Sequence, residues 1–232
     1  MALWRFGRGW SEAVMQRYLA DLEGRTANFG TPYEEMIPEN GWTIDGSDDS
    51  IGEEPAGPPV TDGVFERAKQ GLINYDFSDP RIVMGHYDPR TPFVGRDMLL
   101  EIKVFGFRFL NGVRVHSLRE EVLEGRTIFG FRYDTLEGHI ERGAEWFLLA
   151  KDHRTGEVTF KIEAHWRLGE FPNWWMKLGF RIVGNPMRIL WRHLAPRRLR
   201  KLAHQHVEKP VAAPGELAHR GDINPQRTDP SV

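Results

Sequence analysis

The chain has 232 residues, of which 40% are hydrophobic and 28% charged, and its net charge is −2. This composition predicts a soluble chain with a real hydrophobic core, and the small net charge argues against a general attraction to nucleic acid. The absence of cysteine excludes disulfides, thiolate metal sites, iron–sulfur clusters and cysteine nucleophiles. We see neither a signal peptide nor an apolar stretch of roughly 18 residues, and therefore expect a cytoplasmic protein.

The N-terminal 61 residues are predicted to form one short helix and an irregular extension. Residues 11–22 place apolar side chains at intervals of four and begin with a serine that suits a helix N-cap. Residues 25–63 are rich in glycine, proline and acidic residues, so only 42–44 is expected to form a strand. The acidic run 45–49 begins like a calcium loop but lacks the required glycine and the final acidic residue, which favours a solvated loop.

Residues 62–207 are predicted to form the core domain. It opens with a second helix over residues 62–73, with the first residue as its cap. Between residues 98 and 166 apolar and polar residues alternate with a period of two, which predicts five strands. The dipeptide Asn111-Gly112 is the strongest hairpin signal between them. Short connections favour an antiparallel meander, because parallel crossovers need a dozen or more residues.

A long helical region is predicted to close the domain. It begins near Pro172 and repeats apolar residues at helical spacing. An interruption is expected at Asn185-Pro186, because proline pushes the preceding residue out of the helical conformation. Residues 208–232 are polar and have no periodic apolar face, so we expect a disordered tail. The predicted fold class is therefore α+β, with an antiparallel sheet packed on a long C-terminal helix.

The densest group of polar residues lies in the strand–loop–strand segment 130–145. A loop of this kind is able to present a cation, a hydroxyl and an imidazole to one ligand. Arginine suits a carboxylate or phosphate, and histidine titrates near neutral pH. The ligand-binding candidates are Arg132, Tyr133, Thr135, His139, Glu141 and Arg142 from this segment, together with Arg114 and Arg96. The alternative interpretation is a rigid polar corner, in which the acidic residues pair with the arginines and the glycines serve the turn.

Other classes of site have little support in the sequence. The nine histidines form no His-Glu-x-x-His motif and no other group with metal-ligand spacing, so neither a metal nor another cofactor is expected. Walker A, glycine-rich dinucleotide-binding and Gly-x-Ser-x-Gly patterns are also absent from the sequence.

The C-terminal helical region combines tryptophans with a run of basic residues. This composition is typical of an interfacial helix on an anionic membrane, and Arg197, Arg198 and Arg200 are the residues predicted to make that contact. The alternative is a core helix with a solvated far face, whose basic residues favour the helix dipole. Nucleic acid is not expected as a partner, because no strand carries an aromatic RNA-binding pattern.

Segment 130–145 resembles the signature of an uncharacterised family shared by bacteria and plants, domain of unknown function nineteen-ninety. It reads Gly-Phe-Arg-Tyr-Asp-Thr-Leu-Glu-Gly-His, followed after one residue by Glu-Arg-Gly-Ala-Glu, and departs from the family pattern at Asp134 and Ala144. Residues 77–100 also resemble this family, through Phe-Ser-Asp-Pro, His-Tyr-Asp-Pro and Gly-Arg-Asp-Met-Leu-Leu. The resemblance covers roughly residues 62–205 and implies no assigned chemistry.

The order of elements is similar to that of START-like, helix-grip proteins. This resemblance implies a curved sheet wrapped around a long C-terminal helix, with an apolar cavity between them. Aromatic residues of the strands are the predicted lining of such a cavity, although they would equally suit a solid core. These residues are Phe105, Phe107, Phe109, Phe129, Phe131, Trp146, Phe147, Phe160 and Trp166.

Three functions follow as hypotheses. The leading one is a binding domain for a small apolar or amphipathic ligand between sheet and helix. The second is an enzyme of the cyclase or hydrolase type, which requires His139 and Arg132 to converge on one accessible point and fails if they lie on opposite faces of the sheet. The third is a peripheral membrane or partner-docking protein that uses the basic C-terminal helix.

Overall fold

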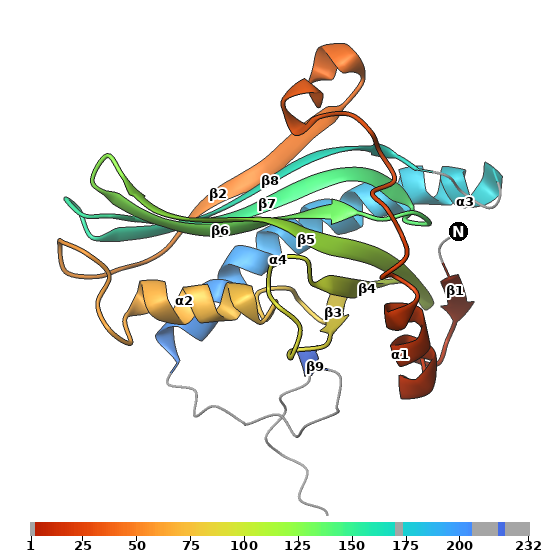
Figure 1. Cartoon of the computed structure of the whole chain (residues 1–232), viewed down its shortest axis with the longest axis horizontal. Helices are drawn as coiled ribbons and strands as arrows, with labels where there is room; N and C mark the ends of the chain where they lie inside the picture. Colours follow the sequence, from red (N-terminus) through yellow and green to blue (C-terminus); the bar gives the residue numbers. More distant parts are fainter. Residues whose placement is uncertain (1–2, 170–173, 206–217, 221–232) are drawn as a thin grey trace, which may run out of the picture.

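A single antiparallel sheet forms most of this computed structural model, which describes residues 3–169, 174–205 and 218–220 (Figure 1). Within those ranges the sheet has nine strands in the order β2-β8-β7-β6-β5-β4-β3-β9, and β1 pairs separately with β5. The strands are β1 Leu3–Phe6, β2 Thr43–Glu53, β3 Val83–Tyr87, β4 Asp97–Val104, β5 Phe107–Leu123, β6 Arg126–Thr135, β7 Glu141–Asp152, β8 Glu157–Leu168 and β9 Ala218–Arg220. Neighbours along the chain from β3 to β8 are also neighbours in the sheet, which confirms the predicted meander.

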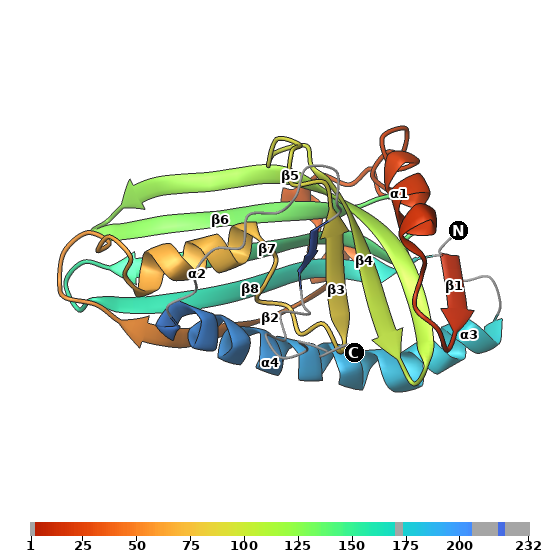
Figure 2. The same cartoon turned by 90° about the horizontal axis from the view of Figure 1, so that it is seen from below.

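Two helices pack against one face of this sheet. The helices are α1 Glu12–Ala20, α2 Val64–Ile73, α3 Trp174–Gly179 and α4 Asn185–His204, with short 3-10 turns at Tyr33–Glu35 and Pro38–Asn40. The long strands curve, and α2 and α4 lie side by side beneath them (Figures 1 and 2). The core between the layers is built from aromatic and aliphatic side chains such as Phe77, Phe147 and Phe160, all fully buried. The predicted helix-grip arrangement is therefore confirmed.

The expected turn at Asn111-Gly112 is wrong, because both residues lie inside β5. The hairpin between β4 and β5 turns instead at Phe105 and Gly106, which have φ values of 46° and 82°. Gly112 serves close packing, since a Cβ atom there would lie 2.5 Å from the Leu22 side chain. The buried Asn111 amide oxygen accepts a hydrogen bond from the Ile140 N–H at 3.2 Å. Asn111 and Gly112 therefore contact segments that are distant in the sequence.

The acidic run 45–49 does not form the expected loop. It lies in the middle of β2, which pairs along its length with β8 at the edge of the sheet. The edge position explains why a strand tolerates so many acidic residues, because alternate side chains face solvent. At the other edge, β3 was not anticipated, and β9 pairs with it. Strand β9 comes from the segment predicted as a tail, whose other residues lie outside the described ranges.

The C-terminal helical region is continuous across the expected interruption. A π-helical stretch at Phe180–Gly184 joins α3 to α4, and Pro186 lies in the first turn of α4, where its missing N–H costs little. The expected start at Pro172 lies outside the described ranges. The buried side of α4 carries Trp191, Ala195 and Leu199, whereas Ile189 and Leu190 are exposed on its outer side. In the described parts of the chain, no helix is both long enough and apolar enough to cross a membrane.

Candidate functional site

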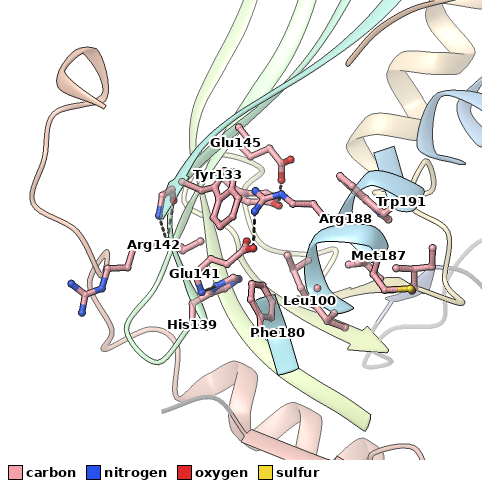
Figure 3. Close-up of a pocket in the computed structure, with 18 of the residues that line it drawn as sticks. Leu100, Tyr133, His139, Glu141, Arg142, Glu145, Phe180, Met187, Arg188 and Trp191 are labelled. Atoms are coloured by element: carbon pink, nitrogen blue, oxygen red, sulfur yellow. Dashed lines mark hydrogen bonds and ion pairs between the residues drawn. The ribbon is translucent and has the colours of Figure 1, made fainter. Parts of the chain in front are cut away.

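A cavity of about 100 Å³ lies between the sheet and the C-terminal helical region (Figure 3). Its walls come from β3 and β4, from the facing ends of β6 and β7, from β8, and from the π-helical stretch and the first turns of α4. One wall is apolar and is formed by Ile82, Val83, Leu100, Ile102, Val104, Phe180 and Met187. The opposite side is polar and is formed by Tyr75, Tyr133, Thr135, His139, Glu141, Glu145 and Arg188.

The polar side is centred on a buried pair, Tyr133 and Glu145, on neighbouring strands β6 and β7. The Tyr133 hydroxyl donates a hydrogen bond to the Glu145 carboxylate. Burial raises the pKa of Glu145, although the positive charge of Arg188 opposes that rise. Burial also raises the pKa of Tyr133 well above 10, and the negative charge of Glu145 adds to it. The phenol therefore remains a donor, and the carboxyl group remains the acceptor, at neutral pH.

Tyr75 contributes a second buried phenol to this side of the cavity. It follows the C-terminus of α2 in the left-handed conformation, with φ of 61°, a position where glycine is usual. Its hydroxyl makes no hydrogen bond of acceptable geometry with any described residue, although the Tyr133 hydroxyl lies nearby. Burial raises the pKa of Tyr75, so this hydroxyl is a neutral donor. A strained backbone thus holds this phenol, whose hydroxyl lacks a well-formed hydrogen bond, in the wall of the cavity.

Arg188 links α4 to the polar side of the cavity. Its Nη1 lies 2.7 Å from Glu141 Oε1, and both side chains are largely buried. The guanidinium also lies 4.0 Å from the centre of the Trp166 ring on β8. These two contacts tie the first turns of α4 to β7 and β8 beside the cavity, and Figure 3 shows the one between Arg188 and Glu141.

His139 is buried in the loop between β6 and β7. Its Nδ1 accepts the backbone N–H of Glu141 at 2.9 Å, so Nε2 carries the proton of the neutral ring. Burial lowers the pKa of His139 to about 3, and the positive charge of Arg188 adds to that effect. The imidazole is therefore neutral across the physiological pH range.

Thr135 and Gly143 shape the same corner. The Thr135 hydroxyl accepts the Gly143 N–H at 2.9 Å and donates to the Asn28 side-chain oxygen at 2.7 Å. Gly143 has φ of 151°, and a Cβ atom there would lie 2.0 Å from the His165 carbonyl oxygen. Only glycine allows β7 to approach β8 this closely, so these two residues hold the corner in place.

The structure brings five of the eight predicted site residues to the cavity and separates the other three. Those at the cavity are Tyr133, Thr135, His139, Glu141 and Arg142, although the guanidinium of Arg142 points away from Glu141 in Figure 3. Those elsewhere are Arg132, Arg114 and Arg96, whose side chains already have protein partners.

Arg132 lies on the opposite face of the sheet from Tyr133, as strand alternation requires. Its Nε donates to Asp134 at 2.9 Å, and its guanidinium stacks on the Tyr33 ring. His139 and Arg132 therefore do not converge on one point, and the enzyme hypothesis built on that pair loses its geometric basis.

Arg114 and Arg96 serve the packing of loops. Arg114 pairs with Asp97 at 2.7 Å and donates to the Leu22 carbonyl at 2.8 Å, which ties the N-terminal extension to the sheet. Arg96 is buried between the rings of Tyr87 and Phe93. Neither side chain is at the cavity, because both point to other partners.

The predicted aromatic lining is wrong in all but one residue. Trp166 lines the cavity. Phe129, Phe131, Phe147 and Phe160 are buried in the core, where they contact other side chains of the two layers. Phe105, Phe107, Phe109 and Trp146 lie elsewhere on the sheet and its hairpins. The cavity is therefore lined mainly by residues other than the predicted aromatic ones.

Two of the three arginines predicted to contact a membrane make hydrogen bonds within the protein. Arg198 Nε donates to the Asp76 carbonyl at 2.6 Å, and Arg200 donates to the Ser50 carbonyl. Arg197 is exposed on the outer side of α4. The three arginines thus do not form one free cationic surface.

Solved structures with a comparable order of elements share little sequence with this chain. Ara h 8.0201 matches with a TM-score of 0.41 at 9% identity, over 70% of this chain and 97% of its own. Major latex-like protein 151 from Panax ginseng matches with a TM-score of 0.40 at 13% identity, over 70% and 97% of the two chains. Hypothetical protein jhp0584 from Helicobacter pylori matches with a TM-score of 0.38 at 13% identity, over 77% and 95%.

No curated protein sequence matches the chain. A protein-family match is found for the larger part of it, over residues 25–200, which include the cavity strands and most of α4. The chain therefore belongs to the family described as domain of unknown function (DUF1990).

Proposed function

We propose that this domain binds a small, mostly apolar molecule with a neutral hydroxyl group in the cavity between the sheet and α4. The observation that carries the proposal is Tyr75, a cavity-lining residue whose buried hydroxyl has the Tyr133 hydroxyl nearby but makes no hydrogen bond of good geometry with a described residue. An unsatisfied buried hydroxyl costs about 1–3 kcal/mol, and native proteins rarely retain one without a use. A ligand oxygen would supply the missing acceptor.

The charges around the cavity favour a neutral ligand. Glu141 and Glu145 lie at its polar end, where Arg188 is already paired with Glu141 and the guanidinium of Arg142 points away from Glu141 (Figure 3). A carboxylate or phosphate would lie beside two carboxyl groups, and Arg188 would already be paired with Glu141. A hydroxyl group suits the site, because it accepts from Tyr75 and donates to a carboxyl oxygen.

The size of the cavity limits the ligand. Pockets for drug-sized ligands usually have about 300–1,000 Å³, whereas this one has about 100 Å³. A cavity of this volume suits a ligand of few heavy atoms, such as a simple phenol or a short alcohol. A larger ligand would require α4 to move and Arg188 to leave Glu141.

Replacing Tyr75 with phenylalanine tests the proposal. We expect phenol to bind the wild type, benzoate not to bind, and Tyr75→Phe to weaken phenol binding about tenfold, the value of one net hydrogen bond. Toluene, which makes no such bond, should bind both proteins equally. Ligand-observed NMR titrations would measure these affinities.

The stability of the same variant separates a ligand role from a structural one. Tyr75→Phe should leave the free energy of unfolding unchanged or raise it by up to about 1 kcal/mol, because it removes an unsatisfied buried group. Tyr87→Phe is the matched control, since its buried hydroxyl donates to the Asn74 carbonyl at 3.0 Å and its loss should cost about 1 kcal/mol. A destabilised Tyr75→Phe that still binds phenol normally would contradict the proposal.

A further inference from the structure

The outer side of the C-terminal helical region exposes large apolar side chains. Trp174 is 78% exposed and Ile182 is 64% exposed, and Leu178 lies between them at a spacing of four residues. Ile189 and Leu190 continue this apolar surface along the first half of α4. A contiguous set of exposed apolar residues on a folded domain is typical of an interaction surface.

The same side of α4 becomes basic toward its C-terminus. Arg197, Arg200 and Lys201 are exposed there, on the helical rows that continue from Ile189 and Leu190. Residues 174–205 contain eight lysines and arginines and no acidic residue, in a chain whose net charge is −2. Two of the eight, Arg188 and Arg192, point inward and pair with Glu141 and Asp45.

We propose that this surface docks on an anionic lipid bilayer. An apolar stretch with tryptophan, followed by clustered basic residues, matches the acyl boundary and the anionic headgroups of a membrane surface together. The docking surface is defined by Trp174, Leu178, Ile182 and Ile189, with Arg197 and Lys201 as its basic end. It differs from the surface predicted from the sequence, because two of the three arginines named there bind backbone carbonyls.

Other exposed aromatic residues lie at the same end of the molecule. Phe6 on β1 and Phe105 in the β4–β5 turn are both mostly exposed, and Arg8 next to them is exposed as well. In both views β1 lies at the end of the molecule that carries α3 (Figures 1 and 2). These exposed side chains therefore lie at the end of the molecule where the docking surface begins.

The docking surface adjoins the cavity. Phe180 and Gly184 line the cavity from the π-helical stretch, and Ile182 between them is exposed. Single π-helical turns are rare and occur frequently at functional sites. Docking would therefore place the π-helical stretch, which also lines the cavity, against the bilayer.

Vesicle flotation of the full chain tests this assignment. Wild-type protein should float with vesicles of phosphatidylcholine and phosphatidylserine about tenfold better than with phosphatidylcholine alone, and added salt should reduce the difference. The double variant L178S/I182S should lose about tenfold in binding, because it removes two exposed apolar contacts without touching the core. R197Q/K201Q should lose the salt-sensitive part of the binding.

The matched control is V122S/L123S, which removes two exposed apolar residues of the β5–β6 hairpin at the opposite end of the sheet. It should float like the wild type. The proposal is overturned if wild-type protein does not float with either vesicle, or if L178S/I182S floats equally well. It is also overturned if light scattering shows a wild-type dimer that L178S/I182S converts to a monomer, since the surface would then join two copies of the chain.

Discussion

Replacing Lys151 with methionine is expected to lower the free energy of unfolding by about 3–5 kcal/mol. Lys151 lies on β7 with its side chain fully buried, and its Nζ contacts Glu54 Oε2 at 2.6 Å and the Pro58 carbonyl at 2.8 Å. Methionine would fill the space but leave the Glu54 carboxylate buried without a cation. An uncompensated buried charge is among the most destabilising changes that one substitution makes.

The Glu54 carboxylate also organises the start of α2. It accepts the backbone N–H groups of Val60 and Phe65, and thereby serves as a remote cap for a helix whose own N-cap, Gly63, has no side chain. Burial alone would raise the pKa of Glu54, but the hydrogen bonds from Lys151 and these two N–H groups hold it below the ordinary value. Loss of Lys151 is therefore expected to loosen α2 as well as β7.

The same substitution at Lys161 is the matched control. Lys161 on β8 pairs with Glu163 at 2.6 Å, but its side chain is 45% exposed, so Lys161→Met should cost less than about 1 kcal/mol. The double variant K151M/E54Q should recover part of the loss, because no charge is then left buried. Urea unfolding would measure all three, and equal losses for Lys151→Met and Lys161→Met would contradict the expected role of burial.

The parts of the fold that were predicted from the sequence are those with a local cause. Period-two alternation identified the strands from β5 to β8, and apolar spacing identified α2. The predicted hairpin turn at Asn111-Gly112 was wrong because these two residues make tertiary contacts within β5 and do not form a turn. Gly112 leaves room for Leu22, and Asn111 satisfies a loop N–H, and both contacts join segments far apart in the chain.

The orientation of α4 shows a second limit. Hydrophobicity ranks Ile189 and Leu190 above Ala195 as core residues, yet the alanine is buried and the other two are exposed. Small residues between the two helices allow α4 to approach α2 closely. One of them is Gly71 on α2, where an added Cβ atom would lie 3.0 Å from the Leu199 side chain of α4. The sequence pattern alone does not reveal which neighbour a helix face will meet.

The candidate site was predictable only in part for the same reason. Alternation places Tyr133 and Arg132 on opposite faces, and it also places Glu141 and Glu145 on one face, which could have directed attention to Glu145. Tyr75, just after α2, and Arg188, in α4, come to the cavity from parts of the chain distant from the β6–β7 corner, and no local pattern marks either residue. The residues of the β6–β7 corner are close together in the sequence and could be predicted as a group. The rest of the cavity is formed by residues that only the tertiary structure brings together.

Acid is expected to destabilise the protein through His139, by about 3 kcal/mol at about pH 4 relative to neutral pH. The folded protein keeps this imidazole neutral, with a pKa of about 3, whereas the unfolded chain takes up a proton near the ordinary value of 6.5. The stabilising contribution is therefore complete above pH 6.5 and is lost as the pH falls toward 3. Each pH unit within that window costs about 1.4 kcal/mol.

His139→Asn isolates this contribution, because the asparagine oxygen still accepts the Glu141 N–H but does not titrate. Urea unfolding between about pH 7 and pH 4 should show a shallower decline for this variant, since other acid-sensitive groups act equally in both proteins. The wild-type protein gives the reference slope. A His139→Asn variant with that same slope would mean that the ring is charged in the folded state. An uncharged ring, by contrast, adds no cation to the cavity and so agrees with a neutral ligand at its polar end.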